Sequence, residues 1–559
     1  MTGVRLSVQF QCHGFDEIGS FHPTGNKREL CYPIEMRKKF IWFSILVPIS
    51  IVGISFLWKS ALFLFILVGP LVAIGWIDIL QNKQTIRRNF PVIGNGRYLA
   101  ELIRPEINQY FIESNWDGMP FSREKRSIVY QRAKGQLDTI PFGTQADVYA
   151  TDYEWINHSL TPKVPSKEAP RILIGGKDCK QKYSASIFNI SAMSYGSLSK
   201  NAVLALNRGA KMGGFYHNTG EGGISPYHLK PGGDLVWQVG TGYFGCRDAD
   251  GSFSLEEFHK RATLPNVKMI EIKLSQGAKP GHGGILPAKK LTEEIIAIRG
   301  VVPGKDVISP PAHTTFSTPV GLLEFVAKLR ENSGGKPTGF KLCLGRKREF
   351  MSIVKAMLET RILPDFITVD GAEGGTGAAP LEFSNSVGTP LNEGLVFVHN
   401  ALTGAGLRDE IKLIVAGKIT TGFNIATKIA LGADLCNSAR GMMFALGCIQ
   451  ALRCNANTCP TGVATQDPEL VAGLDPTNKA VRVANFQKAT VHSLLEVIAA
   501  AGLSHPKELY PRYIQRRVSP MTVKSFAEIY FSVEPGSFLK NVLPDAYARA
   551  WKEANPHQF

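Results

Sequence analysis

Residues 366–377, FITVDGAEGGTG, place a short apolar run directly before a loop in which four of seven residues are glycine. A bounded run of four to eight apolar and β-branched residues is typical of a strand buried on both faces. Glycine lets a backbone turn tightly and bring its N–H groups close to a ligand. The stretch therefore predicts a buried strand that ends at a ligand-binding loop.

The same arrangement recurs along the chain after residue 185, where short apolar segments alternate with helical patterns. Such alternation predicts repeated βα units and a parallel sheet. The expected strands are residues 187–193, 214–218, 235–239, 268–273, 339–343, 366–369, 411–415 and 434–438. Eight of them predict an α/β fold, a (β/α)8 TIM-type barrel, with its ligand site at the carboxyl ends of the strands.

Glycine-rich loops follow several of these strands: SYGS after the first, TGEGG after the second and GKITTG after the seventh. Tight turns alone would explain any one such loop, but explain the whole set poorly. The loops after strands seven and eight are the usual phosphate cradle of such barrels. Flavin mononucleotide (FMN) would fit that cradle.

A barrel takes roughly 250 residues, so a chain of 559 holds additional parts. We expect an N-terminal cytoplasmic segment (1–39), a transmembrane helical hairpin (40–80), a small docking subdomain (81–184), the barrel (185–520) and a C-terminal tail (521–559).

The expected hairpin is an apolar run from Phe40 to Ile77 in which Lys59 is the only charged residue. Each half approaches the ~20 residues that cross a bilayer as a helix. Basic residues precede and follow the pair, which predicts that both ends of the hairpin lie on the cytoplasmic side of the membrane. The catalytic part would then be cytoplasmic, and the membrane would be the inner membrane if the protein is bacterial. A re-entrant or interfacial hairpin, or a buried hairpin of a soluble protein, would give the same hydropathy.

The chain is basic, with 63 Lys and Arg against 47 Asp and Glu, for a formal net charge of +16. No basic run exceeds three residues, and no nucleic-acid-binding motif is present, so we expect no nucleic-acid partner. Membrane lipid is better supported as a partner, and a simply solvated basic surface remains an alternative.

Three of the nine cysteines lie together in CIQALRCNANTCP: Cys448, Cys454 and Cys459. The spacing C-x5-C-x4-C, with proline after the last cysteine, resembles iron–sulfur ligand runs, and three thiolates suit three irons. A zinc site would want a fourth ligand, which this segment lacks. Three buried structural cysteines are the alternative. The other six cysteines show no ligand spacing.

Six motifs resemble the FMN-binding synthase domain of glutamate synthases over roughly residues 185–500. They are NISAMSYGSLSKNA, HNTGEGG, IEIKLSQGAKPGHGGILP, ISPPAH, DGAEGGTGAAP and LGCIQALRCNANTCPTGVATQDPEL. The resemblance implies a barrel holding FMN, a 3Fe-4S cluster on the three cysteines, and reduction of the imine of 2-oxoglutarate to L-glutamate. The N-terminal part resembles a membrane-associated, single-domain branch of that family.

The resemblance also implies roles for charged residues. Lys273, Lys279 and Arg299 match positions that hold the substrate, and Glu221 matches an active-site carboxylate that moves protons. Lys341 matches a lysine near the flavin ring, where a cation stabilises reduced flavin. The alternatives are surface cations, a loop hydrogen-bond acceptor and a buried salt-bridge lysine, respectively.

Further positions match flavin-contact loops by motif: Ser194, Gly196, Gln238, Gly374, Gly375, Thr376 and Gly417. At the eighth strand NSARG departs from the family pattern, so Arg440 would meet the FMN phosphate, unless it is an ordinary helix-capping arginine. His313, in ISPPAH, is as well explained by a structural role. Ile285 stands where the family usually has a glutamine that contacts 2-oxoglutarate, which opens the question of the substrate.

We therefore expect an oxidoreductase of the glutamate synthase type acting on CH–NH2 groups, with a 2-oxo acid and ammonia as substrates. Electrons would come from an external donor, a ferredoxin or a reductase subunit, and ammonia from solution or a separate glutaminase. One alternative keeps both cofactors but changes the amine or the 2-oxo acid, as in N-methylglutamate synthesis. Another is a non-catalytic electron-relay subunit at the membrane.

Overall fold

The computed structural model describes residues 32–559, which form two compact units divided between Gly118 and Met119. Cys12, Cys31 and most of the expected segment 1–39 lie outside the described residues.

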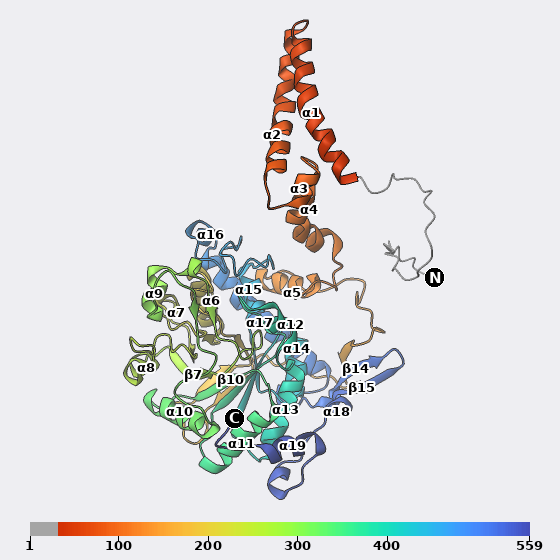
Figure 1. Cartoon of the computed structure of the whole chain (residues 1–559). Coiled ribbons are helices and arrows are strands. Elements are labelled where there is room, and N and C mark those ends of the chain that lie inside the picture. Colours follow the sequence, from red (N-terminus) through yellow and green to blue (C-terminus); the bar gives the residue numbers. More distant parts are fainter. Residues whose placement is uncertain (1–31) are drawn as a thin grey trace, which may run out of the picture. The chain divides into compact units, whose positions relative to one another are not determined.

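The first unit is a helical hairpin followed by short helices (Figure 1). Its elements are α1 (Tyr32–Ser55), the 3-10 helix η1 (Lys59–Leu64), α2 (Phe65–Leu80), α3 (Thr85–Asn89), α4 (Gly94–Ile107) and the π-helical turn η2 (Asn108–Ile112). Lys59 begins η1, and the reversal lies just before it, at Phe56 to Trp58, rather than at Lys59 itself.

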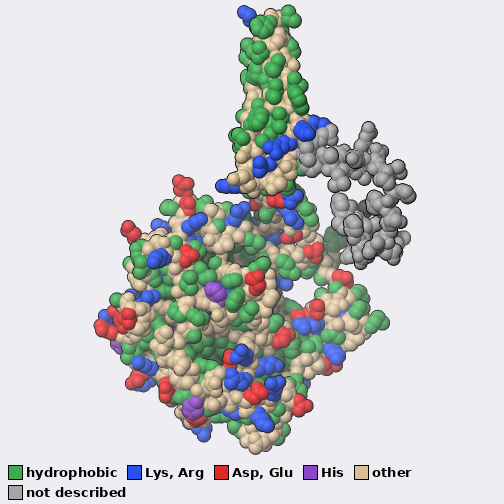
Figure 2. All heavy atoms as spheres, in the orientation of Figure 1, with side chains coloured by type: hydrophobic (Ala, Val, Ile, Leu, Met, Phe, Trp, Pro, Cys, Tyr) green, Lys and Arg blue, Asp and Glu red, His purple; other side chains and the backbone are tan. Residues whose placement is uncertain are grey.

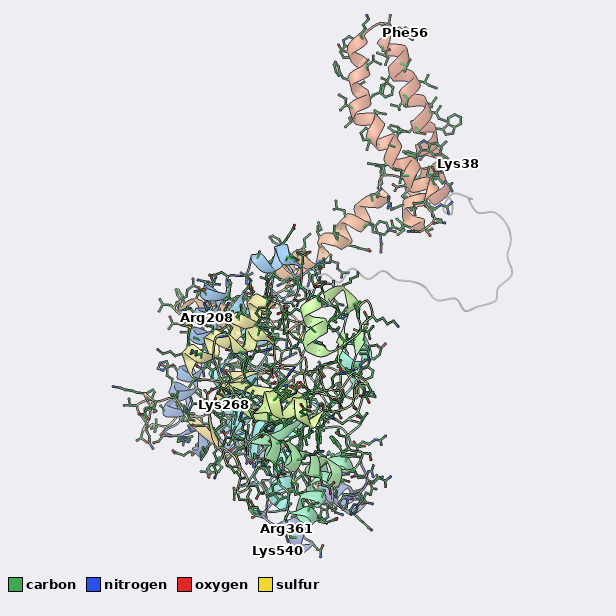
Figure 3. All side chains as sticks on the ribbon, turned by 90° about the vertical axis from the view of Figure 1, so that its left-hand side faces the viewer. Lys38, Phe56, Arg208, Lys268, Arg361 and Lys540 are labelled. Atoms are coloured by element: carbon green, nitrogen blue, oxygen red, sulfur yellow. The ribbon has the colours of Figure 1, made fainter. Side chains whose placement is uncertain are left out.

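The hairpin presents apolar side chains outward along most of its length (Figure 2). Two stretches, Met36–Ser55 and Lys59–Leu80, are long and apolar enough to cross a membrane, and only 11% of each is buried. Lys38 and Phe56 mark its two ends in Figure 3, and Phe56 is 86% exposed. Water would not favour so large an apolar surface.

One buried carboxylate organises the end of the hairpin. Asp78, near the end of α2, pairs with the Arg87 guanidinium at 2.6 Å and accepts a hydrogen bond from the Val92 amide at 2.9 Å. The carboxylate is fully buried, so these donors offset the cost of its burial. Asp78 thereby fixes α3 and the start of α4 to the end of α2.

The second unit is a closed barrel of eight parallel strands. In barrel order they are β4 (Phe188–Ile190), β5 (His217–Asn218), β6 (Leu235–Val239), β7 (Val267–Lys273), β10 (Thr338–Leu342), β11 (Phe366–Asp370), β12 (Lys412–Ala416) and β13 (Leu435–Ser438). The sheet closes where Cys436 to Ser438 of β13 pair with Phe188 to Ile190 of β4. The predicted barrel is confirmed.

All eight predicted strands exist, and two are shorter than expected for identifiable reasons. β4 ends at Ile190 because Ala192 and Met193 belong to a loop that lines a cavity. β5 begins at His217 because Gly214 is the left-handed cap (φ 66°) of the preceding helix. Every residue of β6 and β10 is buried, as expected for strands covered on both faces.

Helices surround the barrel, and polar residues define their starts: Ser199, for example, caps α6 by accepting from the Ala202 amide. The main helices are α6 (Lys200–Gly213), α8 (Leu255–Ala262), α10 (Pro319–Asn332), α11 (Lys347–Thr360), α13 (Leu391–Gly404), α14 (Gly422–Ala430), α15 (Arg440–Leu446) and α17 (Pro476–Ala500). Shorter ones are α5 (Arg123–Lys134), α7 (Pro226–Leu229), α9 (Glu293–Arg299), α12 (Leu381–Ser386), α16 (Pro468–Ala472), α18 (Phe526–Ile529) and α19 (Asp545–Glu553).

Small antiparallel sheets accompany the barrel. A hairpin of β2 (Arg171–Ile174) and β3 (Tyr183–Ser186) packs Ile172 and Ile174 against apolar side chains of the barrel strands, such as Met269. The others join β1 (Glu154–Ile156), β14 (Ile514–Ser519) and β15 (Thr522–Ser525), and join β8 (Ile285–Leu286) to β9 (Val307–Ile308). The expected docking subdomain, 81–184, contains β1, β2 and the start of β3, none of which is among the expected strands.

The expected C-terminal tail packs on the barrel. The Tyr547 hydroxyl of α19 accepts a hydrogen bond from the Asn400 side chain of α13 at 2.8 Å, and the Tyr547 ring stacks on Phe397. The Lys355 ammonium of α11 reaches the Ala554 carbonyl at 2.9 Å. Residues 521–559 therefore complete the outer layer of this unit.

Candidate active site

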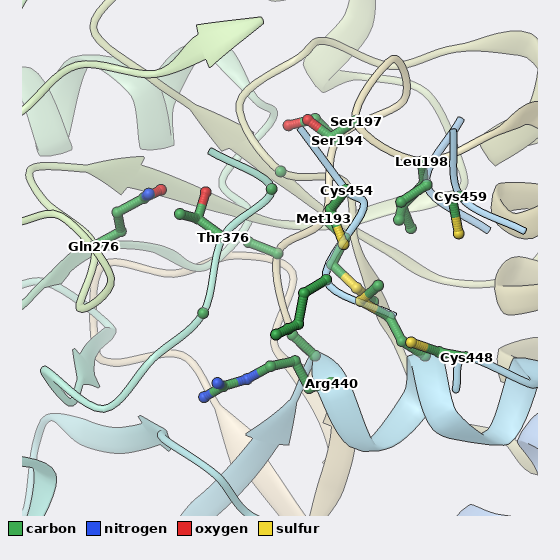
Figure 4. Close-up of a pocket in the computed structure, with 18 of the residues that line it drawn as sticks. Met193, Ser194, Ser197, Leu198, Gln276, Thr376, Arg440, Cys448, Cys454 and Cys459 are labelled. Atoms are coloured by element: carbon green, nitrogen blue, oxygen red, sulfur yellow. The ribbon is translucent and has the colours of Figure 1, made fainter. Parts of the chain in front are cut away.

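A pocket of about 250 Å³ lies where the strands of the barrel end, as expected for this fold (Figure 4). Loops after β4, β5, β7 and β11, the last residues of β6 and β10, and the cysteine segment line it. Of the residues predicted for the site, those on its wall are Ser194, Glu221, Gln238, Lys279, Lys341, Gly375, Thr376, Arg440, Cys448, Cys454 and Cys459. Ile285 lines it too.

A second, smaller cavity of about 60 Å³ shares Gln276, Lys341, Gly375 and Arg440 with the first. The loops after β12 and β13 form its wall, and these are the loops that cradle phosphate in such barrels. Gly374 and Gly417, both predicted flavin contacts, lie here. Lys418, which belongs to the loop GKITTG, also lines this cavity and adds a cation that was not among the predicted site residues.

Arg440 lies across the wall between the two cavities. Its guanidinium donates to the Glu373 carbonyl and stacks over the Phe121 ring at 4.8 Å. A Cβ on Gly375 would stand 2.7 Å from the Arg440 side chain, so a larger residue there would displace the guanidinium from this position. Burial lowers the pKa of Arg440 to about 10, so the guanidinium stays charged near neutral pH.

The acid–base residues form one cluster. The Lys273 ammonium lies 2.7 Å from the Glu221 carboxylate, with Lys279 and Arg299 close by. Burial works to raise the pKa of Glu221, but the cations Lys273, Arg299 and Lys279 outweigh it, and the pKa falls below its ordinary value. A Cβ on Gly284 would stand 2.5 Å from Glu221 Oε1, so this loop passes directly over the carboxylate.

Burial also lowers the pKa values of the three cations, to about 8 for Lys279 and about 10 for Arg299. The Lys279 ammonium donates to the Ala378 carbonyl at 2.8 Å and faces the pocket. Arg299 and Lys273 lie behind the wall. Arg299 donates to the Tyr195 carbonyl at 2.9 Å and stacks over Phe244 at 5.1 Å.

Gly196 and His313 also lie behind the wall. Gly196 donates its amide to the Leu198 carbonyl at 3.1 Å, within the loop after β4. His313 engages both ring nitrogens, with the Tyr243 hydroxyl at 3.1 Å and the Lys273 carbonyl at 3.0 Å. These contacts give His313 a role in positioning the backbone of Lys273.

The barrel interior contains a further carboxylate, on Glu271 of β7. It accepts hydrogen bonds from Gln238 at 2.6 Å, Asn218 at 2.8 Å and Thr368 at 2.7 Å. Glu271 thereby orients Gln238, whose side chain lines the pocket. Lys341 on the next strand lies 3.9 Å from the Asp370 carboxylate.

The three clustered cysteines line the pocket; in Figure 4, Cys448 and Cys459 lie on the opposite side of Met193 from Gln276 and Thr376, and Cys454 is drawn next to Met193. Burial raises the pKa of Cys448 to about 12 and also raises that of Cys454. Burial acts the same way on Cys459, but the Thr461 hydroxyl and neighbouring amide N–H groups outweigh it, so its pKa is lowered. Cys459 thereby differs from the other two cysteines in the direction of its pKa shift.

Within residues 32–559, no three His, Cys, Asp or Glu side chains converge closely enough to hold a single metal ion. Four other cysteines, Cys179, Cys246, Cys343 and Cys436, are buried and unbridged. Phe121 and Pro120, which precede α5, line the pocket although no motif marks them. Only the folded chain brings these two beside Arg440.

The chain is similar to known proteins over most of its length. The family model described as the conserved region in glutamate synthase matches residues 154–504. The glutamate synthase large subunit-like protein YerD of Bacillus subtilis is 39% identical over 480 residues, covering 78% of this chain and 91% of that protein. The archaeal glutamate synthase [NADPH] of Methanocaldococcus jannaschii is 39% identical over 322 residues, covering 57% of this chain and 60% of that protein.

A solved structure of mandelate oxidase is 14% identical, with a TM-score of 0.37, covering 72% of this chain and 98% of its own. The family match spans most of the chain, including the barrel and all three clustered cysteines. This chain is a member of the glutamate synthase family, in the part of that family defined by the conserved synthase region.

Proposed function

We propose that this chain reduces the imine of 2-oxoglutarate, formed with ammonia, to L-glutamate. The observation that carries the proposal is the cluster of Glu221 with Lys273, Lys279 and Arg299, at a pocket that the predicted flavin loops and three cysteines also line. When bound, FMN would supply the hydride and a 3Fe-4S cluster would deliver single electrons from an external donor.

Charge balance supports a substrate with two carboxylates. Three cations surround one carboxylate in the cluster, which leaves two positive charges in excess. Oppositely charged groups at close range in a poorly hydrated site attract far more strongly than in water. Lys279 faces the pocket and is the first contact for a substrate carboxylate. Arg299, behind the pocket wall, adds positive charge without touching the substrate.

Glu221 is placed for proton transfer. Imine formation requires ammonia to lose protons and the carbonyl oxygen to leave as water, so a base within reach of the substrate accelerates it. The lowered pKa keeps Glu221 ionised at neutral pH, and the 2.7 Å contact with Lys273 offers a path for returning the proton.

The residues present fit FMN. Lys341, buried and on the wall of both cavities, would place its charge beside the flavin ring, and Gln238 would donate from its Glu271-held position. Arg440 and Lys418 would face the phosphate. A phosphate held by two cations and glycine N–H groups suits the small cavity after β12 and β13.

The cysteines fit a three-iron cluster better than a single ion. Each iron of such a cluster takes one protein thiolate, so three thiols spaced around a cavity suit it without converging on one point. Amide N–H groups directed at the Cys459 sulfur would stabilise its thiolate. Replacing Cys454 with Ser should abolish the cluster signal in electron paramagnetic resonance (EPR), and replacing buried Cys179 should leave it intact.

The test is to purify the intact protein anaerobically, reduce it, and add 2-oxoglutarate with ammonia. We expect flavin reoxidation with formation of L-glutamate in equal amount. If 2-oxoglutarate with ammonia fails to reoxidise the flavin, but a different 2-oxo acid succeeds, or methylamine succeeds in place of ammonia, the proposed substrate is wrong and the successful compound takes its place. Ile285 motivates that second candidate, because an apolar side chain on the pocket wall offers no hydrogen bond to a distal carboxylate. No reoxidation by any acceptor would indicate an electron-relay subunit.

We also propose that the hairpin tethers the enzyme to a membrane with the barrel on the cytoplasmic side. The exposed apolar surface of α1 and α2 supports lipid as its partner, as do the basic residues at both chain ends of the hairpin, Arg37 to Lys39 and Lys83 to Arg88. A ferredoxin or reductase subunit would supply electrons, and ammonia would come from solution or a separate glutaminase.

A further inference from the structure

Two buried cations beside the clustered cysteines have no carboxylate partner. Lys290 is 3% exposed and Arg126 is 6% exposed, and neither forms an ion pair with any described residue. Burying a charge without a counter-ion is costly, so buried cations are normally paired. An anion that the polypeptide itself does not supply would balance them.

Lys290 lies between the cysteine segment and the loop after β4. It ends the 3-10 helix η3 (Ala288–Lys290), and its ammonium donates to the carbonyls of Ala464 at 2.9 Å and Ser197 at 3.2 Å. Ala464 belongs to the segment whose amides point at Cys459. Asn457, which lies between Cys454 and Cys459 in the chain, donates to the Lys289 carbonyl at 3.3 Å, so η3 is held against the cysteine segment.

Arg126 lies on α5, a second element that contacts the cysteine segment. The Tyr130 hydroxyl of the same helix donates to the Cys448 carbonyl at 2.6 Å, which fixes α5 beside that cysteine. The Arg126 Nε is buried without a hydrogen-bond partner. The Tyr130 ring also packs edge-on against Phe444 of α15, the helix that leads into Cys448, with ring centroids 6.1 Å apart.

We propose that Lys290 and Arg126 are the counter-charges of the anionic group held by Cys448, Cys454 and Cys459, and that they set its reduction potential. The inference rests on the proposed iron–sulfur cluster. Four sulfides and three thiolates outweigh the charge of three ferric irons, so the oxidised group is already anionic. One electron from the external one-electron donor adds one more negative charge, which the two cations stabilise.

The experiment is a redox titration of the cluster EPR signal in the intact, anaerobically purified protein and four variants. K290Q removes a charge, K290R keeps it, and R126Q tests the second cation. The matched control is K289Q, because Lys289 is the adjacent residue and is exposed. We expect K290Q to shift the one-electron equilibrium at least tenfold, about 59 mV toward more negative potential. R126Q should shift it in the same direction, and K290R and K289Q should stay near wild type.

A K290Q potential equal to that of K289Q would overturn the proposal, as would a K290R shift as large as that of K290Q. If K290Q loses its cluster while K290R keeps both the cluster and the wild-type potential, the result would support a requirement for positive charge at this position. Loss in both variants would instead indicate packing and overturn the proposal. A wild-type protein without any cluster signal would show that the proposed cluster is absent. Failure to turn over 2-oxoglutarate would contradict the proposed reaction, but the reduction potential of the cluster could still be measured.

Discussion

The hairpin unit and the barrel unit use the same classes of side chain in opposite ways. Along α1 and α2 the large apolar residues are outside, and Leu57 is 95% exposed. In the barrel they are inside, and the barrel additionally buries charged groups such as Lys273, Lys341 and Glu271. An apolar exterior indicates contact with lipid or protein, and buried charge indicates chemistry or binding.

Both units nevertheless bury one aspartate for a structural purpose. Asp78 ties α3 and α4 to the hairpin, and Asp365 ties Arg330 of α10, at 2.9 Å, to the amide of Thr338 on β10. The difference between the units is therefore not whether charge is buried but whether it faces a cavity. Four experiments test this difference between the two units.

Deletion of residues 40–77 should have the largest effect, complete loss of membrane association, because it removes both apolar helices. The measurement is partition between pelleted membranes and supernatant. The flavin absorbance of the released protein is the control for an intact barrel. Continued sedimentation of a folded, flavin-bound protein would show that the hairpin is not the anchor.

Glu221→Gln should lower kcat by about 10²–10⁴-fold, because general acid–base catalysis typically contributes that much. The amide keeps the size of the side chain but cannot accept a proton. Glu256→Gln is the matched control, since the Glu256 side chain is 80% exposed. Steady-state kinetics would decide, and an unchanged kcat in Glu221→Gln would remove this residue from the mechanism.

Asp365→Ala should lower the free energy of unfolding by about 3–5 kcal/mol, because it removes the buried carboxylate 2.9 Å from the buried Arg330 and leaves only the half-exposed Asp178 at 4.0 Å. The control is the exposed ion pair of Arg549 with Glu553: Glu553→Ala should lower the free energy of unfolding by at most about 1 kcal/mol. Urea denaturation of both variants measures the difference. Equal losses would show that burial does not distinguish the two pairs.

The smallest expected effect is a pH dependence of KM for the 2-oxo acid. The pKa of Lys279 is about 8, so its charge is present below that pH and is lost as the pH rises through it. KM should be flat below pH 8 and rise above it, approaching tenfold per unit, at a constant concentration of free ammonia. Lys279→Met should raise KM and remove this rise. A rise that persists in Lys279→Met would assign it to another group.

Much of the fold was predictable because each βα unit has a local pattern. FITVD followed by GAEGGTG predicts β11 and its loop, and the structure confirms both, since apolar runs and glycine loops act within a few residues. β1 was not predictable, because it pairs with a distant strand, Glu154 opposite Arg516. β2 and β3 form a local hairpin, but each has only four residues. Local propensity is weak for such short strands.

The candidate site divides in the same way. Glu221, Lys279 and the three cysteines carry their chemistry in motifs, and the structure places all five on one pocket. Lys273, from the motif IEIKLSQGAKPGHGGILP, and Arg299, which lies in none of the quoted motifs, are instead behind its wall. A motif specifies which residue is present, whereas the direction of its side chain depends on the packing of neighbouring loops.

By itself, the sequence determined the eight-strand barrel, the apolar hairpin helices and the chemical types available at the strand ends, because these follow from local periodicity and composition. Only the tertiary structure decided that Phe121 stacks on Arg440, that Glu271 orients Gln238, and that Lys290 and Arg126 flank the cysteines without a counter-ion. Such contacts join residues far apart in the chain, and closing the barrel is what brings them together.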